Sequence, residues 1–137
     1  MRIITLLLLA LLLTGTGLSQ EKKAKPDITF TQILELLNTK TVSLIKKKAL
    51  ELGYHPVTGS RYSNGSHLFQ ILARSDKSFV YSENVNDLNN RWQVLKQQAL
   101  DLGGEIIHDV DYSIEIAING FVFFTDRDTY ISIGKPL

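Results

Sequence analysis

The sequence predicts an α+β protein in which two units follow one another, each a helix packed on an antiparallel meander of strands, after a cleavable signal peptide. Three observations predict this class. Leu44–Gly53 aligns without gaps on Val94–Gly103. After each of these helical segments the apolar period changes from that of a helix to that of a strand. Asn119-Gly120 is the turn signal of a two-residue hairpin. Helices on one face of an antiparallel sheet bury the apolar faces of both.

The N-terminus has the three parts of a secretory signal peptide. Arg2 supplies the positive charge, Ile3–Leu13 is an apolar run with Thr5 as its one polar residue, and small uncharged residues lead to Ser19. An apolar run of ~7–15 residues is typical of a signal peptide, whereas a membrane-spanning helix needs ~18–20. We therefore expect residues 1–19 to be removed during export, leaving no membrane anchor.

The mature chain forms one domain of ordinary size. It begins near Gln20 or Glu21; the polar, lysine-rich residues 20–27 predict a disordered lead-in, and residues 28–137 a single domain. The chain has no cysteine, so disulfides cannot stabilise it. The full sequence has 15 basic and 14 acidic residues, and removal of Arg2 with the signal peptide leaves 14 of each. This balance gives no reason to expect nucleic acid or an anionic membrane as partner.

Two segments have the helical period and supply the pseudo-repeats, over about 38–83 and 86–134. Each carries an apolar stripe within about 80° of a helical wheel: Val42, Ile45, Ala49 and Leu52 in the first, and Trp92, Leu95, Ala99 and Leu102 in the second. Gly53 and Gly103 suit the left-handed position after a helix. The expected N-caps are Thr39 or Thr41, and Asn86 or Asp87. One more short helix is expected over residues 29–37.

Strand patterns follow both helices. After the second helix we expect strands over Glu105–His108, Tyr112–Ile118, Phe121–Thr125 and Thr129–Ile133. After the first helix the signal is weaker, and it favours strands over Tyr54–Val57, His67–Ala73 and Phe79–Ser82, with a loop rich in Gly, Ser and Asn over Thr58–Ser66. We expect the two meanders to join or to stack, because neighbours in sequence tend to pair in space.

The predicted hairpin fixes which residues share a face. A two-residue turn pairs Ile118 with Phe121, Ile116 with Phe123, and Glu115 with Phe124. The Ile and Phe side chains of the first two pairs, with Ile114, then form the core face. The opposite face receives Ala117, Val122 and Phe124, which is unusually apolar for a surface in contact with water alone.

Two interpretations of this second face stay open. A second helix layer or the other meander covers it, as in layered domains. Alternatively, a partner binds it through Val122 and Phe124, with Phe124 at the centre and Tyr130 at the aromatic rim, since large exposed apolar patches mark interfaces.

The acidic strand ends are a candidate metal site. If they converge, Asp109, Asp111, Asp126 and Asp128, with His108, offer oxygen ligands to calcium. No loop has the glycine-punctuated spacing of a calcium site, so we interpret the aspartates as turn formers and edge protection and predict no metal.

The sequence holds no catalytic or cofactor signature. It has no Gly-x-Ser-x-Gly elbow, phosphate loop or zinc spacing, and its three histidines lie far apart. We expect a secreted or periplasmic, non-enzymatic module without cofactor that contacts a protein or an envelope component. The alternative is a small exported hydrolase or ligand-binding protein with its site near His108, Asp109 and Asp128. A third reading is a homodimer with the sheet face as its seam.

Overall fold

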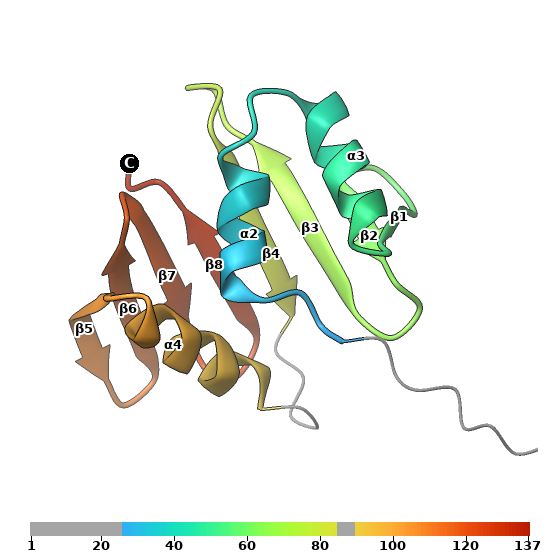
Figure 1. Ribbon diagram of the computed structural model, residues 1–137. Coiled ribbons are helices and arrows are strands. Elements are labelled where there is room, and N and C mark those ends of the chain that lie inside the picture. Colours follow the sequence, from blue (N-terminus) through green and yellow to red (C-terminus); the bar gives the residue numbers. More distant parts are fainter. Residues whose placement is uncertain (1–25, 85–89) are drawn as a thin grey trace, which may run out of the picture.

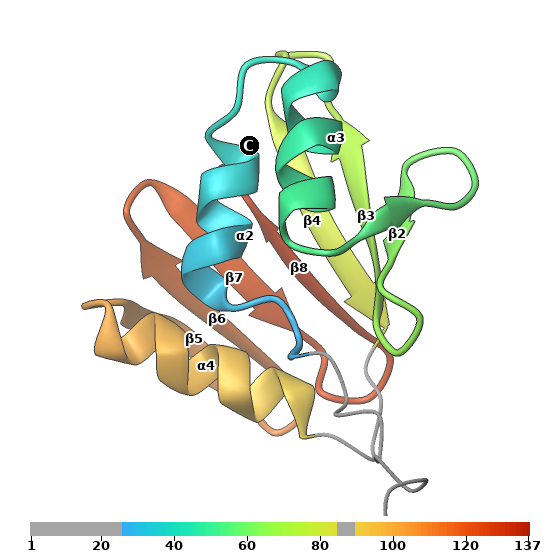
Figure 2. The same cartoon turned by 45° about the vertical axis from the view of Figure 1, so that its right-hand side comes forward.

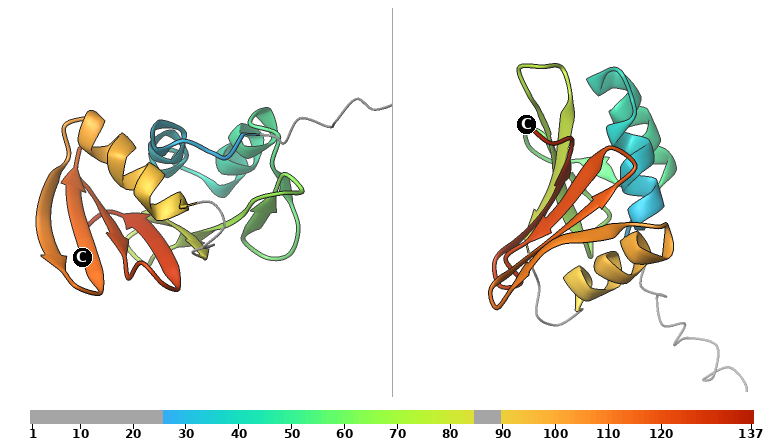
Figure 3. Two further views of the ribbon diagram at one scale, coloured as in Figure 1. Left: turned by 90° about the horizontal axis from the view of Figure 1, so that it is seen from below. Right: turned by 90° about the vertical axis from the view of Figure 1, so that its left-hand side faces the viewer.

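The computed structural model of the protein describes residues 26–84 and 90–137. The expected signal peptide, 1–19, and most of the lead-in, 20–27, lie outside these ranges. Within them, three helices lie on one face of an eight-stranded antiparallel sheet (Figure 1, Figure 3). The α+β class is therefore confirmed. No helix in the described ranges has the length and apolar character needed to cross a membrane.

A helical segment precedes each group of four strands. The first half of the chain holds α2 (Phe30–Leu37), α3 (Val42–Glu51), β1 (His55–Pro56), β2 (Arg61–Ser63), β3 (Leu68–Ala73) and β4 (Phe79–Asn84). The second holds α4 (Arg91–Asp101), β5 (Glu105–Val110), β6 (Ser113–Ile118), β7 (Phe121–Thr125) and β8 (Tyr130–Gly134). The strand order is β1-β2-β3-β4-β8-β7-β6-β5. The two meanders thus join in one sheet, through an antiparallel pair of β4 and β8.

The helix ends follow local capping rules at α2 and α3. Thr29 and Gln32 form a reciprocal capping box at the start of α2, and the Thr41 hydroxyl accepts a hydrogen bond from the Leu44 amide at the start of α3. Gly53 follows α3 with φ 84°, the left-handed conformation that a side chain would strain. The expected helix over 29–37 is confirmed within one residue.

The second repeat helix begins later than expected. Asn86 and Asp87 lie outside the described residues, and α4 begins at Arg91 after Asn90, which has φ 45° and no side-chain capping bond. Gly103 ends it with φ 90°, as the sequence predicts.

The apolar stripes of both repeat helices are narrower than expected. Ile45 and Ala49 of α3 are buried, as are Leu95 and Ala99 of α4. By contrast, the outer stripe residues Val42 and Leu102 are 50% and 44% exposed. A straight helix touches a twisted sheet over only a turn or two, so one end of each stripe extends past the contact, while the other ends, Leu52 and Trp92, pack against the core half-buried.

The hairpin prediction is confirmed residue by residue. Ile118 pairs with Phe121, Ile116 with Phe123 and Glu115 with Phe124. Asn119 and Gly120 both have positive φ, 48° and 79°, as a type I′ turn requires.

The expected loop over Thr58–Ser66 is wrong in part, because it contains β2. Tyr62 in the middle of β2 is 3% exposed, and its ring stacks on Phe69 of β3 with centroids 5.4 Å apart. A strand of three residues with one apolar side chain has no alternation to detect, and tertiary contact with β3 fixes it.

The core lies between the helices and one face of the sheet. Figure 2 and Figure 3 show α2 between α3 and α4 over this face. The ring of Phe30 in α2 contacts that of Phe123 in β7, with centroids 6.1 Å apart. The buried apolar side chains of the long strands all belong to this face: Phe69, Ile71, Phe79, Tyr81, Ile114, Ile116, Ile118, Phe121, Phe123, Ile131 and Ile133.

Candidate functional surface and a buried polar ring

The sheet face opposite the helices carries a row of apolar residues. Strand register places five residues side by side across β3, β4, β8, β7 and β6: Leu72, Val80, Gly134, Val122 and Ala117. Paired residues of neighbouring strands point to the same face. We call this side of the sheet the open face. The side chain of Leu72 is 44% exposed, and those of Val80, Ala117 and Val122 are half-buried.

The predicted binding residues belong to the open face. Phe124 pairs with Ser132 of β8 and Glu115 of β6, in the row next to Val122. Tyr130 of β8 is 42% exposed, and its ring lies beside that of Phe124 with centroids 5.5 Å apart. The structure therefore brings Val122, Phe124 and Tyr130 together.

No second layer covers the open face within the described ranges. The three helices all lie on the opposite side (Figure 3), and the other meander continues the same sheet instead of packing against it. Gly134 has no side chain, but it leaves no gap in the apolar row, because neighbouring side chains fill the space above it. A Cβ on Gly134 would lie 3.1 Å from Val80 Cγ2 and 3.4 Å from Arg74 Nη2. The open face therefore has no hollow at that point.

The residues of the alternative site are not brought together. His108 pairs with Glu115 and Asp109 with Ile114, and neighbouring residues of a strand point to opposite faces. Asp109 instead accepts a hydrogen bond from Arg127 Nη2 at 2.5 Å. Among the described residues, no group of three His, Asp or Glu side chains could hold a metal ion.

The acidic turn before β8 has a structural role. Asp126 Oδ1 accepts hydrogen bonds from the amides of Asp128, Thr129 and Tyr130, at 3.2, 2.8 and 3.0 Å. Burial alone would raise the pKa of Asp126, but these bonds and that of the Thr129 hydroxyl lower it below its ordinary value of 3.8. Asp126 is thus a turn former, as the sequence suggests.

A closed ring of buried polar groups is the feature that sequence reasoning missed. The Tyr54 hydroxyl lies 2.7 Å from His67 Nδ1, and His67 Nε2 contacts the Glu83 carboxylate. Arg91 Nε donates to the other oxygen of Glu83 at 3.0 Å. Arg91 Nη2 donates to the carbonyl of Ile28 at 2.5 Å, and the Ile28 amide donates to the Tyr54 hydroxyl at 3.1 Å.

One tautomer satisfies every member of this ring. In the tautomer of His67 that carries its proton on Nε2, that nitrogen donates to Glu83, while Nδ1 accepts from the Tyr54 hydroxyl. The hydroxyl oxygen then accepts from the Ile28 amide, and the carboxylate accepts from both His67 and Arg91. Both ring nitrogens of His67 are therefore engaged within the ring.

The charges of the ring compensate one another. The side chains of Glu83 and Arg91 are 1% and 6% exposed. Burial is the largest single effect and disfavours the charged Arg91, but the Glu83 carboxylate and the Tyr81 hydroxyl together outweigh it and raise the pKa of Arg91. Burial also raises the pKa of Tyr54 to about 12. Tyr54 and Arg91 therefore keep their protons at any physiological pH.

A signal for this ring was present in β4. Phe79, Tyr81 and Glu83 alternate onto the core face of the strand, so a carboxylate stands at a position where an apolar residue is expected. A buried carboxylate requires a cation or several donors. The pattern indicates that a partner exists, but the partners lie too far along the chain for spacing to name them.

Comparison with known proteins identifies no relative of this chain. No protein-family model matches it, and neither the curated proteins nor the solved structures contain a significant match.

Proposed function

We propose that the protein is an exported, non-enzymatic interaction module that binds another protein through the open face of its sheet. The observation that carries this proposal is the cluster of Val122, Phe124 and Tyr130 on a sheet face without a helix over it in the described ranges. The module acts in the periplasm or the external medium, and it needs no cofactor.

Rigid aromatic side chains favour protein binding at this face. Tyr130 and Phe124 lie on neighbouring strands whose backbone hydrogen bonds fix both positions, so little conformational entropy is lost when a partner docks. Tyrosine is enriched among the residues that dominate interface energies. Polar and charged residues flank the apolar row, with Glu115 and His108 paired on the β5 side. An apolar centre with a polar rim is the usual anatomy of a protein interface.

The module consists of two helix-plus-meander units in tandem. Support comes from equivalent positions: the buried apolar residues of the two helices, Ile45 and Ala49 of α3 and Leu95 and Ala99 of α4, stand at matching places in the alignment. The strand order, with β4 and β8 together and β1 and β5 at the two edges, also favours two related units. Their central pairing makes one broad face out of two small sheets.

The binding test uses Phe124→Asp with Leu44→Asp as the matched control. Leu44 is 46% exposed on the helical side, so the control adds the same charge away from the open face. Envelope proteins cross-linked to the tagged module are quantified for each variant, after circular dichroism verifies folding. We expect Phe124→Asp to lose a partner that the wild type and Leu44→Asp retain.

Two outcomes contradict the binding proposal. One is equal partner recovery with both variants folded. The other is a partner lost only with Leu44→Asp, which would move the interface to the helices. Sedimentation velocity over a range of concentrations identifies the homodimer alternative, in which the wild type self-associates and Phe124→Asp does not.

Export has a separate test. We expect the mature chain to begin near Gln20 or Glu21 when the full sequence is expressed in a bacterium that secretes through the general pathway. Intact-mass spectrometry of the envelope fraction measures this directly. A cytoplasmic product that still begins at Met1 contradicts the proposed localisation and leaves the sheet-face test unaffected.

A further inference from the structure

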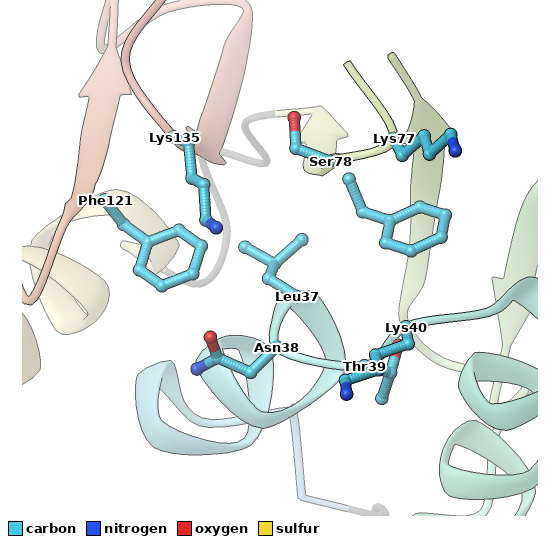
Figure 4. Close-up of a pocket in the computed structure, with 9 residues that line it drawn as sticks. Leu37, Asn38, Thr39, Lys40, Lys77, Ser78, Phe121 and Lys135 are labelled. Atoms are coloured by element: carbon cyan, nitrogen blue, oxygen red, sulfur yellow. The ribbon is translucent and has the colours of Figure 1, made fainter. Parts of the chain in front are cut away.

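A pocket of about 390 Å³ lies at the end of the molecule where α2, the β3–β4 turn and the chain after β8 meet (Figure 4). Its apolar wall consists of Leu37, Phe79 and Phe121, whose side chains belong to the core and are 4%, 6% and 4% exposed. Figure 4 shows Phe121 and Lys135 on one side of Leu37, with Lys77 and Ser78 on the other. The volume falls within the range of ~300–1,000 Å³ that small-molecule pockets occupy.

The charged residues that line the pocket are all basic. Lys40 follows α2, Lys77 lies in the β3–β4 turn and Lys135 follows β8. The three lysines come from segments far apart in the sequence, so the fold and not the local sequence gathers them. All three lysine side chains are exposed, and their positive charges raise the electrostatic potential over the pocket. This potential favours an anion.

The nearest acidic residue in sequence, Asp76, stays ionised, and Ser78 of the same turn engages its carboxylate. Asp76 Oδ1 accepts hydrogen bonds from the Ser78 amide at 3.0 Å and the Ser78 hydroxyl at 2.6 Å. These bonds lower the pKa of Asp76 below its ordinary value. Arg74 adds a further cation beside the pocket, because its Nη1 donates to the carbonyl of Lys135 at 2.5 Å, which also holds the Lys135 backbone in place.

We infer that this pocket binds a small amphipathic anion, a phosphate or carboxylate group attached to an apolar portion. The lysines hold the anionic group, and the wall of Leu37, Phe79 and Phe121 takes the apolar portion. This site lies at the end of the strands and is separate from Val122, Phe124 and Tyr130, so it is independent of the proposed function.

The test is calorimetric titration of the mature protein with octyl phosphate below its critical micelle concentration. We expect saturable binding of octyl phosphate. Inorganic phosphate has no apolar portion and octyl glucoside has no charge, so we expect each to bind at least about tenfold more weakly, which corresponds to ~1.4 kcal/mol. Vesicles of phosphatidylglycerol, compared with phosphatidylcholine, determine whether a bilayer can present the anion or only a free molecule reaches the pocket.

The variants place the binding in this pocket. We expect Lys40→Gln with Lys135→Gln to weaken octyl phosphate binding at least about tenfold. The control, Lys46→Gln with Lys47→Gln, removes the same charge from exposed positions of α3 and should leave the affinity unchanged. Equal binding of octyl phosphate and octyl glucoside, equal weakening by both double variants, or no saturable binding overturns the inference.

Discussion

The contribution of the polar ring to stability can be tested at a single residue, Arg91. Arg91→Met leaves the Glu83 carboxylate, 1% exposed, with His67 as its remaining side-chain partner. Breaking a buried ion pair by removing one partner costs roughly 3–5 kcal/mol, and we expect that loss in the free energy of unfolding. Urea denaturation followed by circular dichroism measures it.

Two further variants separate charge from packing at this position. Lys96→Met removes the other cation of α4 from a half-buried position and should cost less than about 1 kcal/mol. Glu83→Leu combined with Arg91→Met removes both charges and should recover much of the loss, because apolar pairs often replace buried ion pairs without cost. If Arg91→Met is no more destabilising than Lys96→Met, the ring does not support the fold.

The hydroxyl of Tyr54 makes the stability depend on alkaline pH. Its pKa is raised by burial from 10.0 to about 12, so the folded protein keeps this proton more tightly than the unfolded chain does. The stabilisation is therefore fully present below pH 10 and is lost as the pH rises toward 12. We expect the free energy of unfolding to fall over this window, and to fall less steeply in Tyr54→Phe. Urea titrations at a series of pH values measure both slopes; identical slopes contradict this role.

At the scale of elements, two glycines test the close packing of α4 on β6 against backbone strain in a turn. A Cβ on Gly104 would lie 2.8 Å from the carbonyl oxygen of Ala99 and 2.8 Å from Ile116 Cγ2. A Cβ on Gly120 meets nothing within 4 Å, but its φ is +79°. We expect Gly104→Ala to cost ~1–3 kcal/mol through overpacking and Gly120→Ala ~1 kcal/mol through strain alone. Thermal unfolding ranks the two, and the reverse order contradicts the packing shown at Gly104.

The elements with a strong local period are the ones the sequence predicts well. The hairpin of β6 and β7 has strict alternation and a turn that only certain residues allow, so its register follows from local chemistry. The sequence predicts helices α3 and α4, but it does not predict which residues of each apolar stripe stay exposed. The curvature of the sheet decides how much of a helix it contacts. Strand β2 depends on Tyr62 stacking on Phe69, a contact that no local pattern encodes.

The candidate surface can be predicted from local sequence patterns, whereas the polar ring cannot. Val122 and Phe124 share a face by alternation alone, so the sequence is enough to place them together. The ring joins Ile28, Tyr54, His67, Glu83 and Arg91, which come from five separate segments. Only the pairing of strands and the docking of α4 bring them within hydrogen-bond distance.

At the scale of the whole molecule, the two halves of the chain share their interior. Strand β8 pairs with β7 of its own half and with β4 of the other. Helix α2 belongs to the first half, yet its Phe30 packs on Phe123 of the second. The ion pair of Glu83 and Arg91 also crosses from one half to the other. The two halves therefore share one apolar core within the described ranges.

Fragments of the chain test this dependence. Residues 20–87 and 88–137 expressed separately would each expose a strand edge, β4 or β8, and the apolar surface under α2. Small units bury too little surface to fold alone, so we expect neither fragment to give dispersed amide resonances in NMR, and an equimolar mixture to regain the spectrum of the intact protein. Arg91→Met in the second fragment should weaken this complementation, because it removes the cation that pairs with Glu83 of the first. A fragment that folds by itself would mean that one unit is a domain in its own right, with the central β4–β8 pair as an interface between domains.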